Sequence, residues 1–189
     1  IASSDIPMYA TYGMTETCSH IALQKISGHD AHHYFTPLRG VHISVDEKNC
    51  LVADVPFLTE KIYTNDVVTI IDEEKFIWQG RWDNMINSGG VKIFPEKIEQ
   101  LIAQTEVFKA HFSSAIFFVA GIADFSLGSR AVIITNTAND TNWQHVLKQL
   151  EQSCSKYEIP KAVMAVSKFI YTDNGKIQRK LTLQANGLA

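Results

Sequence analysis

The chain has 189 residues, of which 46% are hydrophobic and 20% are charged, a composition typical of a folded globular protein with one domain or two small ones. Its formal net charge of −3 disfavours nucleic acid or an acidic membrane surface as the main partner. Its longest apolar runs, such as 115–120, are too short to cross a bilayer, so no membrane span is expected.

Three cysteines, Cys18, Cys50 and Cys154, are widely spaced and form no CxxC pattern. Such an odd, scattered set predicts reduced thiols in a cytoplasmic protein. The chain begins with isoleucine, and residues 1–5 have neither the basic nor the apolar segment of a signal peptide. We therefore expect the chain to be a piece of a longer protein.

Residues 1–80 predict a small antiparallel β unit that resembles a barrel. Short runs of alternating apolar and polar side chains are separated by turn residues, as in half-buried strands. A mostly polar loop is expected over 27–37, and residues 46–49 and 72–74 fit hairpin turns. The expected strands are 6–12, 41–45, 50–55, 67–71 and 75–79.

The residues after 84 predict a compact α+β unit of about a hundred residues, an ordinary size for a small domain. Pro95 fits the first turn of a helix over 95–104, whose apolar residues lie on one face. A second helix is expected over 142–155, with strands at 114–119, 130–135 and 161–166. The predicted fold class is α+β, with a β-rich unit at 1–82 and an α+β carboxy-terminal unit at 83–189.

A polar segment near the middle of the chain, 80–92, separates these two patterns. It contains the paired glycines Gly89 and Gly90, and such a pair lets the backbone approach a ligand closely or adopt positive φ. A polar loop that leads into a rigid helix start is a suitable place for one unit to swing relative to the other.

The turn after the first predicted strand carries side chains that suit a nucleotide. Thr15 and Glu16 follow Gly13, and a hydroxyl and a carboxylate there can bind phosphate oxygen and Mg²⁺. Tyr12 can stack on a base. An ordinary strand-to-loop turn explains the same residues and, from this motif alone, is the favoured interpretation.

Three further polar residues are candidates for binding or catalysis. Asp66 can accept hydrogen bonds from two ribose hydroxyls, and Arg81 can add a second contact to ribose or phosphate. Lys176, on a glycine-containing turn, can bring a positive charge to developing negative charge on phosphoryl or carboxylate oxygens. A turn aspartate, a surface cation and a solvated tail are the alternatives for the three.

The histidines His29, His32 and His33 favour a surface loop over a metal site. Only Asp30 stands near them at ligand spacing, and a zinc site needs a fourth ligand. Cys18 has no base close to it in the sequence that would activate it as a nucleophile.

Four motifs occur in a fixed order along the chain, and together they resemble the adenylate-forming superfamily of acyl-CoA synthetases, luciferases and peptide-synthetase adenylation domains. The resemblance covers 8–181. Within the superfamily, segments 12–19 and 83–93 look most like the 2-succinylbenzoate–CoA ligases of menaquinone biosynthesis. The motifs are Tyr-Gly-Met-Thr-Glu-Thr at 12–17, Thr-Asn-Asp at 64–66, Gly-Arg-Trp-Asp at 80–83 followed by Ser-Gly-Gly and Pro-Glu-Lys-Ile-Glu, and Asn-Gly-Lys-Ile-Gln-Arg-Lys at 174–180.

The resemblance implies a site for ATP or AMP in the first unit. Tyr12 would stack on adenine, and Gly13 would be one of the cofactor-binding residues beside it. Thr15 would contact the α-phosphate and Glu16 would hold Mg²⁺, both as catalytic residues.

The resemblance also assigns residues further along the chain. Asp66 and Arg81 would bind the ribose hydroxyls, although Asn65 stands where the family usually has glycine. Asp83 would be the hinge on which the carboxy-terminal unit rotates between two half-reactions. Lys176 would reach the acyl carboxylate and the α-phosphate during adenylation.

In the thioester-forming arrangement, the loop of Ser88, Gly89 and Gly90 would line the pantetheine channel of coenzyme A. The family's phosphate loop and most of its acyl pocket precede the part that this chain resembles. The chain would therefore be the last part of the large adenylation domain followed by the whole mobile small domain, and we expect it to be inactive alone.

The parent protein is expected to adenylate a carboxylic acid, 2-succinylbenzoate in the first place, and to transfer the acyl group to coenzyme A. Another acyl-CoA or aryl-CoA synthetase and a carrier-loading adenylation domain remain open as alternatives. A module that contacts nucleotide or coenzyme A without turnover is the alternative from another class.

Overall fold

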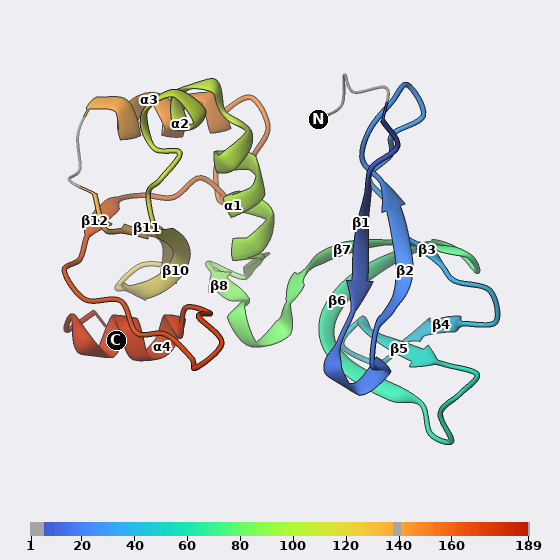
Figure 1. Ribbon diagram of the computed structural model, residues 1–189. Helices are drawn as coiled ribbons and strands as arrows, with labels where there is room; N and C mark the ends of the chain where they lie inside the picture. The colour runs from blue at the N-terminus through green and yellow to red at the C-terminus, as the bar shows by residue number, and fades with distance from the viewer. Residues whose placement is uncertain (1–5, 138–140, 189) are drawn as a thin grey trace. The chain divides into compact units, whose positions relative to one another are not determined.

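Two compact units make up the chain in the computed structural model, which describes residues 6–137 and 141–188 (Figure 1). One unit spans Ile1–Asp83 and the other Asn84–Ala189. The fold is mixed α/β with mostly antiparallel sheets. The expectation that no signal peptide is present rests on residues 1–5, which lie outside the described residues. Within the described ranges, no helix is both long and apolar enough to span a bilayer.

The first unit consists of strands that pair with their neighbours in sequence, always antiparallel. One sheet has the order β1-β2-β3 and the other β4-β5-β6-β7. A bridge between Phe35 and Phe76 connects the two sheets. The strands are β1 (Tyr9–Gly13), β2 (His20–Lys25), β3 (Thr36–Pro37), β4 (His42–Val45), β5 (Cys50–Asp54), β6 (Ile62–Asp72) and β7 (Lys75–Arg81).

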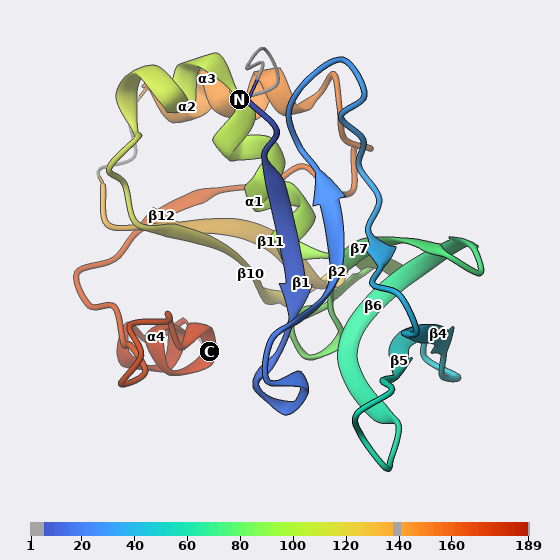
Figure 2. The same cartoon turned by 45° about the vertical axis from the view of Figure 1, so that its right-hand side comes forward.

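The long strand β6 curves along its length (Figure 2). Its pairing with β7 shifts register between Val67 and Val68 and again between Ile70 and Asp72. Such irregularities bend a strand and increase its twist, so the sheet curls over an apolar core. That core consists of Ala22, Leu51, Val68 and Phe76. The antiparallel β character predicted for this part of the chain is confirmed.

Three strands of this unit differ from the prediction. The two-residue β3 lies in the segment 27–37 that was expected to be a loop. β2 is not predicted because His20–Lys25 lacks a regular alternation of apolar and polar residues, and only two of its six residues are fully buried. β6 begins at Ile62 rather than at residue 67. Its first residues include the turn formers Thr64 and Asn65, but pairing with β5 and β7 on both sides outweighs that local preference.

The second unit contains a three-stranded sheet with the order β10-β11-β12. β10 and β11 are antiparallel, whereas β11 and β12 are parallel and joined through α3. Figure 1 shows α1, α2 and α3 on one face of this sheet and α4 on the other. The elements are β8 (Ile86–Ser88), β9 (Val91–Ile93), α1 (Pro95–Gln104), α2 (Glu106–His111), β10 (Phe117–Asp124), β11 (Gly128–Thr135), α3 (Thr141–Leu150), β12 (Val163–Ala165) and α4 (Arg179–Ala185).

Successive residues of β10 and β11 point to opposite faces of the sheet, as the pleat of a strand requires. Val119 and Ile133 pack into a cluster with residues of α1, α2 and α3. Phe118 and Ile134 pack into a second cluster that includes Leu183 of α4. Both faces are therefore covered, which explains why these strands read as nearly continuous apolar runs.

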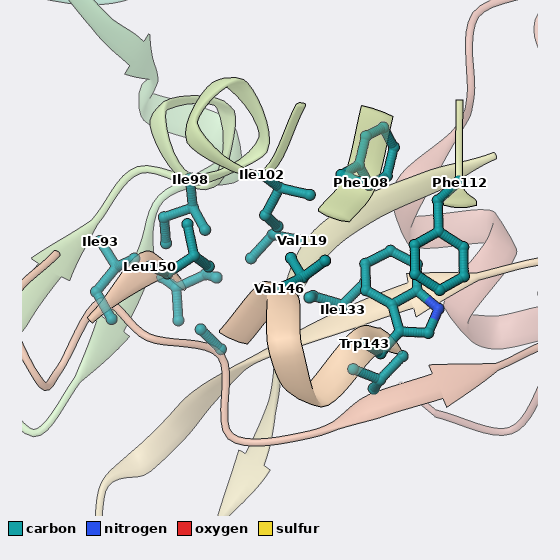
Figure 3. Close-up of a cluster of buried hydrophobic side chains, with 13 residues drawn as sticks. Ile93, Ile98, Ile102, Phe108, Phe112, Val119, Ile133, Trp143, Val146 and Leu150 are labelled. Atoms are coloured by element: carbon teal, nitrogen blue, oxygen red, sulfur yellow. The ribbon is translucent and has the colours of Figure 1, made fainter. Parts of the chain in front are cut away.

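The larger of these clusters is the main core of the second unit (Figure 3). Ile98 and Ile102 project from α1 into it, and both are fully buried. Trp143 of α3 is also fully buried and stacks on Phe112, with 4.3 Å between the ring centroids. The helix predicted over 95–104 has these bounds in the structure because Pro95 starts it and its apolar face meets this core.

The short helices α2 and α4 are not predicted from the sequence. α2 has six residues and α4 has seven, too few to show a helical period. α2 is fixed by the side chain of Thr105, which accepts the N–H of Phe108 at 3.2 Å. α4 is fixed by Thr182, whose buried hydroxyl accepts the N–H of Ile170 at 3.0 Å.

Candidate functional site

A tight turn between β1 and β2 presents Thr15 and Glu16 to solvent. The turn is closed by Thr17, which is fully buried. Its hydroxyl accepts the N–H of Met14 at 3.0 Å and lies 2.6 Å from the carbonyl oxygen of Ser19. Thr17 is a structural residue that sequence reasoning passed over. Its only sequence signal is a hydroxyl four residues after the end of β1.

Glu16 suits the role of a single carboxylate ligand for Mg²⁺. Its side chain is exposed on this fixed turn, and Mg²⁺ commonly binds one or two carboxylates together with waters and substrate phosphates. Among the described residues, no group of three or more His, Cys, Asp or Glu side chains is arranged to hold a metal ion.

His32 lies in the loop that also contains His29 and His33. Its ring stacks on the ring of Tyr34, with 3.8 Å between the ring centroids.

Gly13 lies where β1 and β2 approach each other most closely. A Cβ atom at this position would lie 2.4 Å from the carbonyl oxygen of Ser19 and 2.5 Å from the Cα atom of His20. Both neighbours are backbone, so they cannot rotate away. Glycine is therefore required here by the geometry of the turn, independently of any ligand.

Replacing Gly13 by alanine is expected to lower the free energy of unfolding of the chain by about 1–3 kcal/mol, the usual cost of forcing an extra carbon into packed surroundings. Urea unfolding followed by circular dichroism measures this. Thr11→Ala, at an exposed position of the same strand, is the matched control and should stay near wild type. An unchanged midpoint for Gly13→Ala would show that the turn relaxes freely.

Asp66 connects three strands of the first unit. Its Oδ2 accepts the hydroxyl of Tyr12 at 2.8 Å, and its Oδ1 accepts the indole N–H of Trp78 at 3.1 Å. Its backbone pairs with Arg81 across β6 and β7. The structure thus brings together the three candidates Tyr12, Asp66 and Arg81, and adds Trp78.

The side chain of Tyr12 is held by both its ring and its hydroxyl. The ring meets Phe76 edge-on at 5.3 Å and Phe35 at 5.8 Å between centroids. Burial, and then the negative charge of Asp66, raise the pKa of Tyr12 far above its ordinary value. Tyr12 therefore remains a hydrogen-bond donor at every physiological pH and keeps one lone pair of Asp66 occupied.

Arg81 and Asp83 form a two-pronged ion pair at the end of the first unit. The guanidinium donates from Nε to Oδ1 at 2.9 Å and from Nη2 to Oδ2 at 3.0 Å. Both side chains are about half exposed. The residue predicted as a hinge is thus paired with the residue predicted to bind ribose.

Gly89 and Gly90 form the two-residue turn between β8 and β9. Their φ angles are 57° and 85°, which is the pattern of a type I′ hairpin turn. The N–H of Gly90 donates to the side chain of Asn87 at 3.1 Å, and the N–H of Gly89 donates to the carbonyl of Leu127 at 2.9 Å. Ser88 is only 3% exposed, so the exposed surface of this loop is glycine backbone.

Lys176 lies on a closed turn near the carboxy-terminal end. Its N–H donates to the hydroxyl of Thr172 at 3.0 Å, and its carbonyl accepts the N–H of Thr172 at 2.8 Å. Gly175 has φ of 77°, which only glycine adopts without strain. The side chain of Lys176 is exposed, and within the described part of the chain its ammonium group has no ion-pair partner.

No protein-family model matches the chain. Curated relatives do: it is 26% identical to the 2-succinylbenzoate–CoA ligase of Staphylococcus epidermidis over 198 residues, and 31% identical to that of Listeria monocytogenes over 196 residues. Each alignment includes 93% of this chain and 40% of the relative. The chain thus spans about two-fifths of the length of the curated relatives that it matches.

Solved structures show the same fold. The o-succinylbenzoate CoA synthetase of Bacillus subtilis, in complex with the acyl-adenylate intermediate OSB-AMP, aligns with a TM-score of 0.72 and 18% identity. That alignment covers 93% of this chain and 40% of the other. At this identity, the likeness establishes the fold.

Proposed function

We propose a function from the premise that this chain belongs by homology to the AMP-forming acyl-CoA synthetases, several of its curated homologues being 2-succinylbenzoate–CoA ligases. In this proposal the chain is the carboxy-terminal part of a longer ligase. That ligase joins a carboxylic acid to coenzyme A at the expense of ATP. The observation that carries the proposal is the convergence of Tyr12, Asp66 and Arg81 in one unit of a chain homologous to such ligases over 93% of its length.

The ribose and base of ATP would bind at Asp66. A carboxylate offers about four lone-pair positions, and two are occupied by Tyr12 and Trp78. The remaining two can accept ribose hydroxyls, as carboxylates do in other nucleotide sites. The donors from Tyr12 and Trp78 hold the carboxylate in one orientation before the nucleotide arrives, which reduces the entropy lost on binding.

The phosphates would lie beside the turn that carries Thr15 and Glu16. The hydroxyl of Thr15 would donate to an oxygen of the α-phosphate, and the carboxylate of Glu16 would be one ligand of Mg²⁺. When bound, Mg²⁺ neutralises charge on the phosphate oxygens. The buried hydroxyl of Thr17 keeps the turn in shape, so both exposed side chains start from fixed backbone positions.

The first half-reaction forms an acyl-adenylate. An oxygen of the substrate carboxylate attacks the α-phosphorus, a P–O bond breaks, and pyrophosphate leaves. Two anions must approach each other in this step, so a positive charge at the reacting oxygens lowers the barrier. Lys176 would supply it, because it is exposed on a turn whose hydrogen bonds fix its backbone.

The second half-reaction forms the thioester. The thiol of coenzyme A loses its proton, sulfur attacks the acyl carbon, and AMP leaves with the C–O bond electrons. The Gly89–Gly90 turn would border the pantetheine arm, because a surface of exposed glycine backbone allows a narrow chain to pass closely. Rotation at Asp83 would remove Lys176 from the reacting groups after the first half-reaction and bring the Gly89–Gly90 turn to them for the second.

The substrate proposed is 2-succinylbenzoate, from the names of the curated homologues. A panel of carboxylic acids incubated with the longer protein, ATP and Mg²⁺, with pyrophosphate release as the readout, tests it. We expect 2-succinylbenzoate to have the highest kcat/KM of the panel, and benzoate and fatty acids of several lengths to be poor substrates. A preference for a fatty acid would contradict the substrate while preserving the reaction class. The 189-residue chain alone should release no pyrophosphate.

A further inference from the structure

Arg179, the first residue of α4, contacts α1, which lies on the other face of the sheet of the second unit. Its guanidinium donates to both carboxylate oxygens of Glu99 on α1, at 2.7 and 2.9 Å, and to the carbonyl of Val119 on β10 at 3.0 Å. The N–H of Val119 donates to the same Glu99 at 2.7 Å. The guanidinium also lies over the ring of Phe118, 5.7 Å from its centroid.

The contacts of Arg179 extend to the beginning of the unit. Its Nη2 lies 3.6 Å from a carboxylate oxygen of Glu96, one turn before Glu99 on α1. The same oxygen of Glu96 accepts the side-chain amide of Asn84. Asn84 is the first residue of the second unit, so a continuous polar chain connects that residue to the start of α4.

A gain in net stability is a weak explanation for this partly buried ion pair. The side chains of Arg179 and Glu99 are only 22% and 19% exposed. Burial raises the pKa of Glu99 above its ordinary value even though Arg179 and the N–H of Val119 act in the opposite direction. Buried ion pairs commonly add little net stability over apolar residues of the same size. What a two-pronged pair does supply is a fixed geometry.

Arg179 follows Lys176 by three residues, and the segment between them is also held. Ile177 forms a bridge with Tyr171 across the base of the turn. The N–H of Gln178 donates to the carbonyl of Ile170 at 2.8 Å, and its side-chain amide donates to the carbonyl of Tyr171 at 3.0 Å. The turn that carries Lys176 is therefore closed locally, Ile177 packs on the apolar cluster that includes Phe118 of β10, and Arg179 is the next residue that joins it by polar contacts to α1 and β10.

We propose that the Arg179–Glu99 pair is a positioning device for Lys176, which fixes the lysine turn relative to α1 and to the first residue of the second unit. The proposal rests on the function assigned above to Lys176. With the pair intact, the turn moves together with the rest of the unit. Without it, the turn is held by its own hydrogen bonds, by α4 and by the packing of Ile177 on the cluster that includes Phe118, and the ammonium group samples positions away from the reacting oxygens.

Arg179→Met is the main test, because methionine keeps an unbranched apolar stem over Phe118 and loses the guanidinium. Lys97→Met is the matched control, since Lys97 is on α1, as Glu99 is, and pairs with the distant Glu158 at 2.9 Å. In hydrogen–deuterium exchange of the 189-residue chain, we expect segment 170–178 to exchange faster in Arg179→Met and at the wild-type rate in Lys97→Met. Glu99→Gln, which keeps the shape of the side chain, serves if Arg179→Met does not fold.

In the longer ligase, Arg179→Met should lower kcat for adenylation, measured as ATP–pyrophosphate exchange, by about 10- to 100-fold, as small misplacements of catalytic groups do. The KM for ATP and the rate of thioester formation from supplied acyl-adenylate should stay within about twofold, since neither uses a correctly placed Lys176. Arg179→Lys keeps the positive charge but cannot donate two parallel hydrogen bonds to Glu99, so it should restore part of the lost kcat.

The outcomes separate this inference from the function on which it rests. If Lys176→Ala leaves adenylation intact, the proposed function of Lys176 is wrong. If Lys176→Ala abolishes adenylation but Arg179→Met and Glu99→Gln keep the wild-type rate, the positioning role alone is wrong. Equal losses in adenylation and in thioester formation would also overturn it, because they would show that the pair only supports the folded unit.

Discussion

Replacing Lys176 by alanine is expected to slow adenylation by about 10²- to 10³-fold, the usual loss when one preorganised charge-stabilising group is removed from an active site. The side chain is exposed on a closed turn and contributes nothing to the core of the second unit, so folding should be unchanged. ATP–pyrophosphate exchange with the longer protein measures the effect. Thioester formation from supplied acyl-adenylate should proceed at close to the wild-type rate.

Lys180→Ala is the matched control for Lys176. Lys180 lies four residues further along and is also exposed, but it is on α4 rather than on the turn. A general effect of removing a positive charge near the carboxy-terminal end would appear in both variants. If Lys176→Ala lowers both half-reactions equally, or if Lys180→Ala lowers adenylation as strongly, the assignment of Lys176 is incorrect.

Asp66→Asn is expected to weaken the binding of AMP to the longer protein by about 100-fold. The ribose hydroxyls would lose two hydrogen bonds to a charged acceptor, each worth about 1.5 kcal/mol or more, and about 1.4 kcal/mol corresponds to a factor of ten. Isothermal titration calorimetry measures the dissociation constant directly. The amide is nearly the size of the carboxylate, so the curled sheet should remain intact.

Tyr12→Phe separates the effect of the charge of Asp66 from the effect of the hydrogen bond that Tyr12 donates to it. Phenylalanine keeps the ring contacts with Phe35 and Phe76 but removes the donor at 2.8 Å from Asp66. We expect a loss of about 1 kcal/mol in stability and a change in AMP affinity of only a few-fold. Equal affinity of the wild type and Asp66→Asn for AMP would show that the nucleotide does not bind at this carboxylate.

The part of the fold that was predictable from the sequence is the part in which local pattern and tertiary packing agree. The helix at Pro95–Gln104 has an N-terminal proline and an apolar face that meets the core. The hairpin at 46–49 has Asp46, whose side chain accepts the N–H groups of Lys48 and Cys50, each at 2.8 Å. In both places the deciding contacts are between residues close in sequence.

The elements that could not be predicted depend on contacts between distant residues. The strand at His20–Lys25 forms because β1 and β3 pair with its two edges. The helix at Arg179–Ala185 has too few residues to show a period, and Arg179 is fixed by Glu99, eighty positions earlier in the chain. A single sequence does not specify which distant partner satisfies such a residue.

The candidate site shows the same division. Motif order alone pointed to Tyr12, Asp66 and Arg81, which do come together: Asp66 and Arg81 pair across β6 and β7, and Tyr12 of β1 donates its hydroxyl to Asp66. Their roles remain predictions. Two residues that support the site were missed, because the hydrogen bonds by which Thr17 closes its turn and Trp78 holds Asp66 leave no pattern in the sequence. Sequence reasoning grouped Ser88 with the glycines after it, whereas the structure buries Ser88 and exposes the glycines.

The most direct test of the central claim is the identity of the products made by the longer protein from ATP, Mg²⁺, coenzyme A and 2-succinylbenzoate. Mass spectrometry of the acyl-CoA, combined with chromatography of the nucleotides, measures them together. An AMP-forming acid–CoA ligase produces one AMP and one pyrophosphate for each thioester. Formation of ADP and phosphate, or a nucleotide product that appears without any dependence on a carboxylic acid, would contradict the account.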